Sequence, residues 1–215
     1  MNTFGARLAY DNAVKMLQAA GMNTATAVLT QSSLRLEQAA NIATTQYRFP
    51  VLNNDSNGGN TQFNTEQRLV LQDAFVISEM GLFLALPASA VDSTFILYTY
   101  PSPIIFPLGK ATLGVVYNGN ISISVNNQII LPNWDTMRYR VVPETQDTAN
   151  ATPSIDQFSG NEQGLYPVEP NIILSGSKNN IVQLNLPAAI SAIDTNTRLV
   201  LLMRGVRAQN STSVN

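Results

Sequence analysis

The stretch ISISVNNQIIL (residues 121–131) decides the fold class of this chain. Ile121, Ile123 and Val125 alternate with serines, which is the period of a strand that buries one face. The pair Asn126-Asn127 comes next, and asparagine tolerates the positive φ that both central residues of a type I′ turn require. An apolar run then returns, so the stretch predicts a β-hairpin with a two-residue turn.

Outward from this hairpin, most of the chain after residue 46 has the pattern of strands separated by turns. Residues 75–86 are apolar on both faces, as expected of a strand that is covered on both sides. Further strands are predicted at 47–52, 68–71, 95–100, 137–142, 172–174, 181–186 and 198–206. The polar segments 53–60 and 144–163 are predicted to be surface loops.

The first segment is the one with a convincing helical period. The apolar residues at helical spacing are Ala6, Tyr10, Ala13, Val14 and Leu17, whereas Phe4 and Leu8 fall on a different side of the helix. Gly21 is a suitable C-terminal cap. For residues 24–38 two alternatives stay open, because the alternation of Leu34 and Leu36 favours a strand while residues 36–40 favour a helix.

Eight or more short strands joined by turn-rich connections predict a mainly β protein with a single jelly-roll-like β-sandwich. The helix lies outside that unit. The expected organisation is an N-terminal helical or extended arm at residues 1–33, followed by the sandwich domain at residues 34–215.

The composition favours association between copies. The chain is 45% hydrophobic but only 12% charged, whereas ordinary soluble domains carry about 25% charged residues. Depletion of charge is typical of the cores of protein interfaces. A neutral secreted domain is the alternative. The apolar stripe of the first helix would need a partner to be ordered, so Phe4, Leu8, Tyr10, Val14 and Leu17 are predicted to bind a neighbouring subunit or an underlying layer.

Several classes of function are disfavoured. The net charge is −2 and there is no block of Lys and Arg, so no sequence-specific nucleic-acid binding is expected. Cysteine and histidine are both absent, which removes the thiolate nucleophile and the commonest general base. Phosphate-binding, dinucleotide-binding and nucleophile-elbow motifs are also missing. We therefore expect no enzyme activity and no cofactor.

The acidic residues in or beside the predicted strands are Asp73, Glu79, Asp135, Glu144 and Glu169. We expect these carboxylates to pair with arginine or to cap turns rather than to act in catalysis. The loop Asn53–Asn60 begins like a calcium-binding loop, but its twelfth position is Asn64 where a bidentate Glu is needed, so no metal site is predicted.

Aromatic residues gather in one part of the sequence and leave two interpretations open. They are Tyr98, Tyr100, Phe106, Tyr117, Trp134 and Tyr139. Trp134 and Tyr139 are candidates for surface recognition of a carbohydrate, since Trp134 lies beside Asn133 and Asp135. Aromatic side chains in strands are more often core or interface anchors.

The N-terminus has no basic region followed by an apolar run, so no secretory signal is predicted. No apolar stretch approaches the roughly 20 residues that span a bilayer. We therefore expect synthesis in a cytoplasm and no transmembrane segment.

Several stretches resemble virion structural proteins of phages that infect Bacteroidetes-type bacteria, especially the shell proteins of tailless phages. They are TEQRL (65–69), LQDAF (71–75), YTYP (98–101), NWD (133–135), VP (142–143), YPVEPN (166–171), SGSKNN (175–180) and RGVRAQN (204–210). The likeness is one of overall pattern and runs from about residue 34 to residue 215.

The resemblance implies a jelly-roll coat subunit that assembles with many copies of itself and with other virion proteins, and hence a virion location. It leaves open whether the subunit contacts a genome or an internal membrane. A receptor-binding or carbohydrate-binding module of a fibre or spike is the alternative function.

Overall fold

The computed structural model describes residues 3–51, 69–89, 95–142 and 164–211. Its strands are β1 (Val28–Ala39), β2 (Gln46–Val51), β3 (Ala74–Ala85), β4 (Asn120–Val125), β5 (Gln128–Asp135), β6 (Tyr166–Ser175), β7 (Asn180–Asn185) and β8 (Arg198–Gln209). One α-helix, α1 (Thr3–Ala19), precedes them, and the 3₁₀ helices η2 (Gly109–Ala111), η3 (Leu113–Asn118) and η4 (Met137–Tyr139) lie between strands. The predicted mainly β fold is confirmed.

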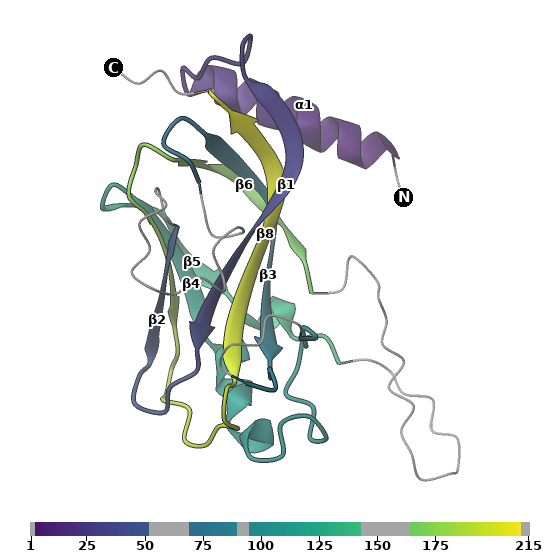
Figure 1. Ribbon diagram of the computed structural model, residues 1–215, viewed down its shortest axis with the longest axis vertical. Coiled ribbons are helices and arrows are strands. Elements are labelled where there is room, and N and C mark those ends of the chain that lie inside the picture. Colours follow the sequence, from purple (N-terminus) through teal and green to yellow (C-terminus); the bar gives the residue numbers. More distant parts are fainter. Residues whose placement is uncertain (1–2, 52–68, 90–94, 143–163, 212–215) are drawn as a thin grey trace.

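The strands form two antiparallel sheets of four strands, with the orders β1-β8-β3-β6 and β2-β7-β4-β5 (Figure 1). The pairing is nested about the turn between β4 and β5. Outside that central pair, β3 pairs with β6, β2 with β7 and β1 with β8. Two further pairs, β3 with β8 and β4 with β7, join the nested pairs within each sheet.

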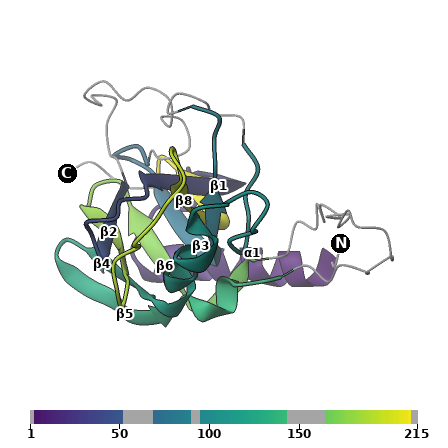
Figure 2. The same ribbon diagram turned by 90° about the horizontal axis from the view of Figure 1, so that it is seen from below.

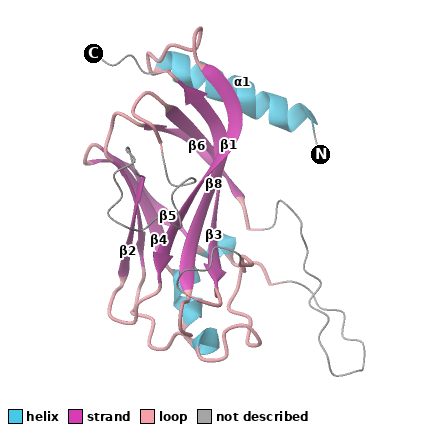
Figure 3. Cartoon of the chain, in the orientation of Figure 1, coloured by secondary structure: helices cyan, strands magenta, loops and turns pink. Residues whose placement is uncertain are grey.

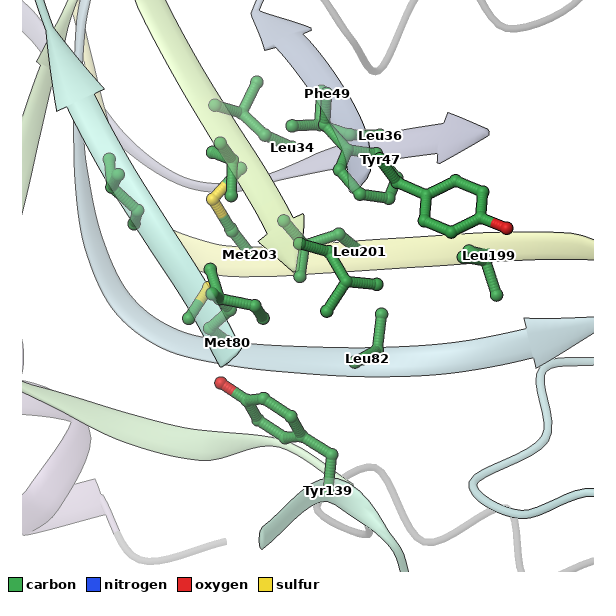
Figure 4. Close-up of a cluster of buried hydrophobic side chains, with 14 of the residues drawn as sticks. Leu34, Leu36, Tyr47, Phe49, Met80, Leu82, Tyr139, Leu199, Leu201 and Met203 are labelled. Atoms are coloured by element: carbon green, nitrogen blue, oxygen red, sulfur yellow. The ribbon is translucent and has the colours of Figure 1, made fainter. Parts of the chain in front are cut away.

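One hydrophobic core lies between the two sheets. Leu34, Leu82 and Leu201 enter it from the first sheet, and Phe49 and Leu184 enter it from the second. Figure 4 shows part of this cluster, in which side chains of β1, β2, β3 and β8 meet. Successive side chains of a strand point to opposite faces of its sheet, so every second residue points inward. The inward side chains of the two sheets form one shared layer between them.

The first sheet is also covered on its outer face. At one end Ala74, Val76, Val206 and Ala208 pack under α1, and at the other Phe83, Ala85 and Val200 pack with Phe95 and Leu97. Burial on both faces explains why residues 74–85 are almost continuously apolar, as the sequence predicted for that strand.

The predicted hairpin is confirmed. Asn126 and Asn127 have φ of 49° and 64°, as both central residues of a type I′ turn require. Ile121, Ile123 and Val125 are buried. The Asn126 side chain accepts a hydrogen bond from the backbone N–H of Asn179, which ties this turn to the turn between β6 and β7.

The structure decides the alternatives for residues 24–38 in favour of a strand, since β1 starts at Val28. The expected boundary between residues 33 and 34 therefore falls inside this strand. The strands predicted at 47–52, 172–174, 181–186 and 198–206 correspond to β2, β6, β7 and β8.

Other predicted strands are wrong. Residues 137–142 begin with the 3₁₀ helix η4, because the Asp135 carboxylate accepts a hydrogen bond from the N–H of Met137 and turns the chain. Residues 95–100 contribute a single bridge, Tyr98 to Leu84. Leu69 and Val70 precede β3 without pairing. The predicted loops at 53–60 and 144–163 lie outside the described residues.

Substitutions in the turn distinguish the contribution of backbone conformation to stability from that of the Asn126 side-chain hydrogen bond. Asn127→Gly should leave stability unchanged or slightly higher, whereas Asn127→Val should cost about 1–3 kcal/mol because a β-branched residue resists positive φ. Chemical denaturation measures the difference. Asn126→Gly is the matched comparison, and it should be destabilising because it removes the acceptor for Asn179. Equal stability of the Gly and Val variants at position 127 would contradict the turn.

Candidate functional site

The first candidate is α1, which lies across the outer face of the first sheet. Ala13 and Leu17 are fully buried there, in a cluster with Val76, Val206 and Ala208. The helix ends at Ala19, and Gly21 follows as its C-terminal cap, with a φ of 75° that suits glycine and an N–H that donates to the carbonyl of Gln18. The C-terminal half of α1 is therefore fixed to the chain's own first sheet.

This docking corrects part of the prediction for the helical stripe. Leu17 contacts the chain's own sheet rather than a neighbour, because the small and apolar residues of β3 and β8 at this end require cover. Tyr10 remains 37% exposed and Val14 is half-buried. Phe4 and Leu8 belong to the helix, but their side chains lie outside what the structure describes.

The N-terminal end of α1 extends past the strands in both views of the molecule (Figures 1 and 2). A short helix in water gains little from its own backbone hydrogen bonds and depends on packing for its stability. The overhanging end thus keeps the geometry of an arm, although the other end of the same helix packs against the chain's own sheet.

The second candidate is the aromatic pair Trp134 and Tyr139. Tyr139 is fully buried in the core, so the prediction that it serves surface recognition is wrong. Trp134 donates a hydrogen bond from Nε1 to the Tyr139 hydroxyl at 2.6 Å, and burial raises the pKa of that phenol. The Arg138 guanidinium lies 4.1 Å from the Trp134 ring centroid. Both interactions engage Trp134 with other residues of the same chain instead of leaving its ring as a free aromatic platform.

Asp73 and Asp135 form hydrogen bonds that hold parts of the chain together. Arg207 donates from Nε and Nη2 to Oδ2 of Asp73, at 2.9 and 2.7 Å, and the N–H of Asn210 bonds to Oδ1. Asp135 caps the turn before η4. These are the roles that the sequence predicted for these two carboxylates. Glu144 lies outside the described residues.

A buried acidic residue that the sequence did not single out organises the loops at one end. Asp194 is 7% exposed, and its two oxygens accept hydrogen bonds from the N–H groups of Leu108 and Gly109 at 3.2 and 2.9 Å. The Thr136 hydroxyl joins a second pair of loops, by donating to the carbonyl of Val116 and accepting from the N–H of Gly119. No local sequence signal marks Asp194, because its partners are 85 and 86 residues away.

Large apolar side chains are exposed on the loops at this end of the molecule. They are Ile42 (55%), Ile96 (48%), Ile104 (60%), Leu108 (66%), Met137 (62%) and Val142 (48%). They lie in the connections β1–β2, β3–β4 and β5–β6, which leave the ends of their strands opposite α1 (Figure 3). Each of these side chains would be favourable to bury against another molecule.

Within the described residues, no group of three or more acidic side chains is placed to hold a metal ion. The Asn53–Asn60 loop falls outside them. None of the described helices is both long and apolar enough to cross a bilayer.

Comparisons with protein-family models, with curated proteins and with solved structures gave no match to this chain.

The hydrogen bonds of Asp194 and Asp135 predict that substitution of the two residues lowers the free energy of unfolding by different amounts. Asp194→Ala should lower the free energy of unfolding by about 1–3 kcal/mol, because it leaves the N–H of Gly109 buried without an acceptor. Asp135→Ala, the matched control, removes an exposed cap whose donor can bond to water, so its cost should be smaller. Urea denaturation of the two variants measures both. If both substitutions lowered the free energy of unfolding equally, burial of the Asp194 hydrogen bonds would add nothing to stability.

Proposed function

We propose that this chain is a jelly-roll structural subunit of a bacteriophage shell, which assembles with copies of itself. The strand order carries this proposal. The nested strand pairs alternate between the two sheets: one sheet contains β1·β8 and β3·β6, and the other contains β2·β7 and β4·β5. This alternation results when one long hairpin is rolled into two facing sheets. Eight strands in two sheets with this order support a jelly roll, an architecture used by viral capsid proteins.

Lectins and other recognition domains also use jelly rolls, so the aromatic residues distinguish the two proposals. A carbohydrate platform needs exposed and roughly coplanar rings. Phe106, Tyr117 and Tyr139 are instead fully buried, and Tyr98 meets Phe106 edge to face with an interplanar angle of 85°. This arrangement favours a packed structural subunit over a sugar-binding module.

The surface composition supports self-association. Only 12% of residues are charged, and several of those charges are used inside the subunit. The Glu37 side chain, which is 6% exposed, forms ion pairs with Arg35 and Arg198, and Asp73 forms one with Arg207. Fewer charges are then left to keep separate copies apart in solution. The exposed apolar residues of the loops add surface that is favourable to bury.

A non-catalytic role agrees with the acidic residues. Asp73, Asp135 and Asp194 each accept hydrogen bonds from backbone or arginine donors. These bonds hold parts of the chain together, which supports a structural role for the three carboxylates. The proposed mechanism is therefore geometric, in which a rigid β unit and the overhanging end of α1 set the positions of neighbouring subunits.

The test of the proposal is the assembly state of the purified chain. At micromolar concentration, sedimentation velocity should detect large assemblies, and negative-stain microscopy should show closed particles. A monomer whose sedimentation coefficient does not change with concentration would contradict the proposal. Binding to a glycan array by such a monomer would support the recognition module instead.

The arm yields a second prediction, which separates the two halves of α1. Removal of residues 1–9 should preserve the fold and the melting temperature, since Ala13 and Leu17 keep their contacts, yet it should abolish particle formation. Leu17→Ala should instead cost about 2–5 kcal/mol of stability, because it leaves a cavity under the helix. Circular dichroism and sedimentation measure the two effects. Normal particles from the shortened chain would show that the arm has no role in assembly.

A further inference from the structure

The two sheets have four edge strands among the described residues, namely β1, β6, β2 and β5. An edge strand exposes a row of unpaired N–H and C=O groups, and natural proteins protect such rows with proline, charge or irregular pairing. Three of the four strands have this protection. The protecting features are Arg48 and Pro50 in β2, Pro132 and two register shifts in β5, and Pro167, Pro170 and a register shift in β6.

The upper half of β1 differs from the other three edges. Its residues 28–34 contain neither proline nor a charged side chain. The pairing of β1 with β8 continues without a shift from Val28↔Gln209 to Ala39↔Arg198, so the strand is regular along its length. Val28 is 54% exposed, and Thr30, Gln31 and Ser33 are also exposed. The charged residues of β1, Arg35 and Glu37, are confined to its other half.

The backbone chemistry of an open strand edge defines what can bind to it. Such an edge is satisfied by another extended segment, which continues the ladder of hydrogen bonds. An uncharged edge is matched by an uncharged segment, and the other three edges of this molecule are excluded by their prolines or charges. The segment of the described chain that fits the free edge of β1 is therefore the same half of β1 in a second copy.

We propose that residues 28–34 of β1 pair antiparallel with the same residues of a second copy, about a two-fold axis. This inference rests on the proposed self-association and names one of its contacts. The overlap of the uncharged segments is complete when Gln31 lies on the axis and Val28 faces Leu34 of the other copy. The four strands of one sheet then continue into the four strands of its copy, and both helices α1 lie on the same side of the joint sheet.

The test introduces equal charges at Gln31, which lies on the proposed axis, and then mixes variants of opposite charge. Gln31→Lys and Gln31→Glu should each weaken the two-fold contact by at least about tenfold, since equal charges would face each other across it. An equimolar mixture of the two variants should restore association, because Lys then faces Glu. Gln46→Lys is the matched control, since Gln46 is an exposed glutamine in the edge strand β2. Sedimentation velocity reports association, and circular dichroism verifies the fold of each variant.

The outcomes separate this inference from the proposed function. If the unmodified chain is monomeric, the proposed function itself fails. If the unmodified chain and both Gln31 variants all assemble alike, self-association stands but the β1 contact is wrong. Loss of assembly in each single variant that the mixture does not restore would overturn pairing about a two-fold axis. Restoration by the mixture, with normal assembly of the Gln46→Lys control, is the expected result.

Discussion

The nested pairing of strands about the Asn126-Asn127 turn is the constraint on which the rest of the fold depends. Once this turn brings β4 and β5 together, each earlier strand can pair with the strand equally far beyond the turn, and β3·β6, β2·β7 and β1·β8 follow in that order. Every outer pair closes a longer loop of chain, at an entropic cost that rises only slowly with loop length. Buried side chains between the sheets offset that cost.

The same constraint explains why the two sheets differ in their outer faces. The first sheet contains both chain-terminal strands, β1 and β8, so the segment before β1 lies close enough to fold back as α1. It covers Val76 and Val206, which require burial. The outer face of the second sheet instead presents Ser122, Ser124, Gln183 and Asn185, of which Gln183 donates a hydrogen bond to the side chain of Asn185. These polar side chains do not require apolar cover, although Ile129 of β5, the cross-strand partner of Ser124, is 64% exposed beside them.

Local sequence patterns correctly predicted those elements whose structure depends on residues close together in the chain. The hairpin at residues 121–131 and the two-sided apolar strand near Phe75 were predicted correctly, because alternation and turn chemistry act over a few residues. The strand order could not be predicted this way, since it depends on which distant strands pair. Burial of Tyr139 was missed for a related reason, as its surroundings come from other parts of the chain. The bonds of Asp194 to Leu108 and Gly109 have no local signature either.

The position of α1 and the open half of β1 are physically linked. Asn23 donates its N–H to the carbonyl of Ser211, which fixes the connection between helix and strand to the end of β8. The helix and the uncharged residues 28–34 therefore lie at the same end of the first sheet (Figure 1). A two-fold contact through β1 would bring the two helices to one side of a continuous sheet. The overhanging helix ends would then remain free to reach further subunits, so one end of the molecule could provide two different contacts, which an extended shell needs and a simple dimer does not.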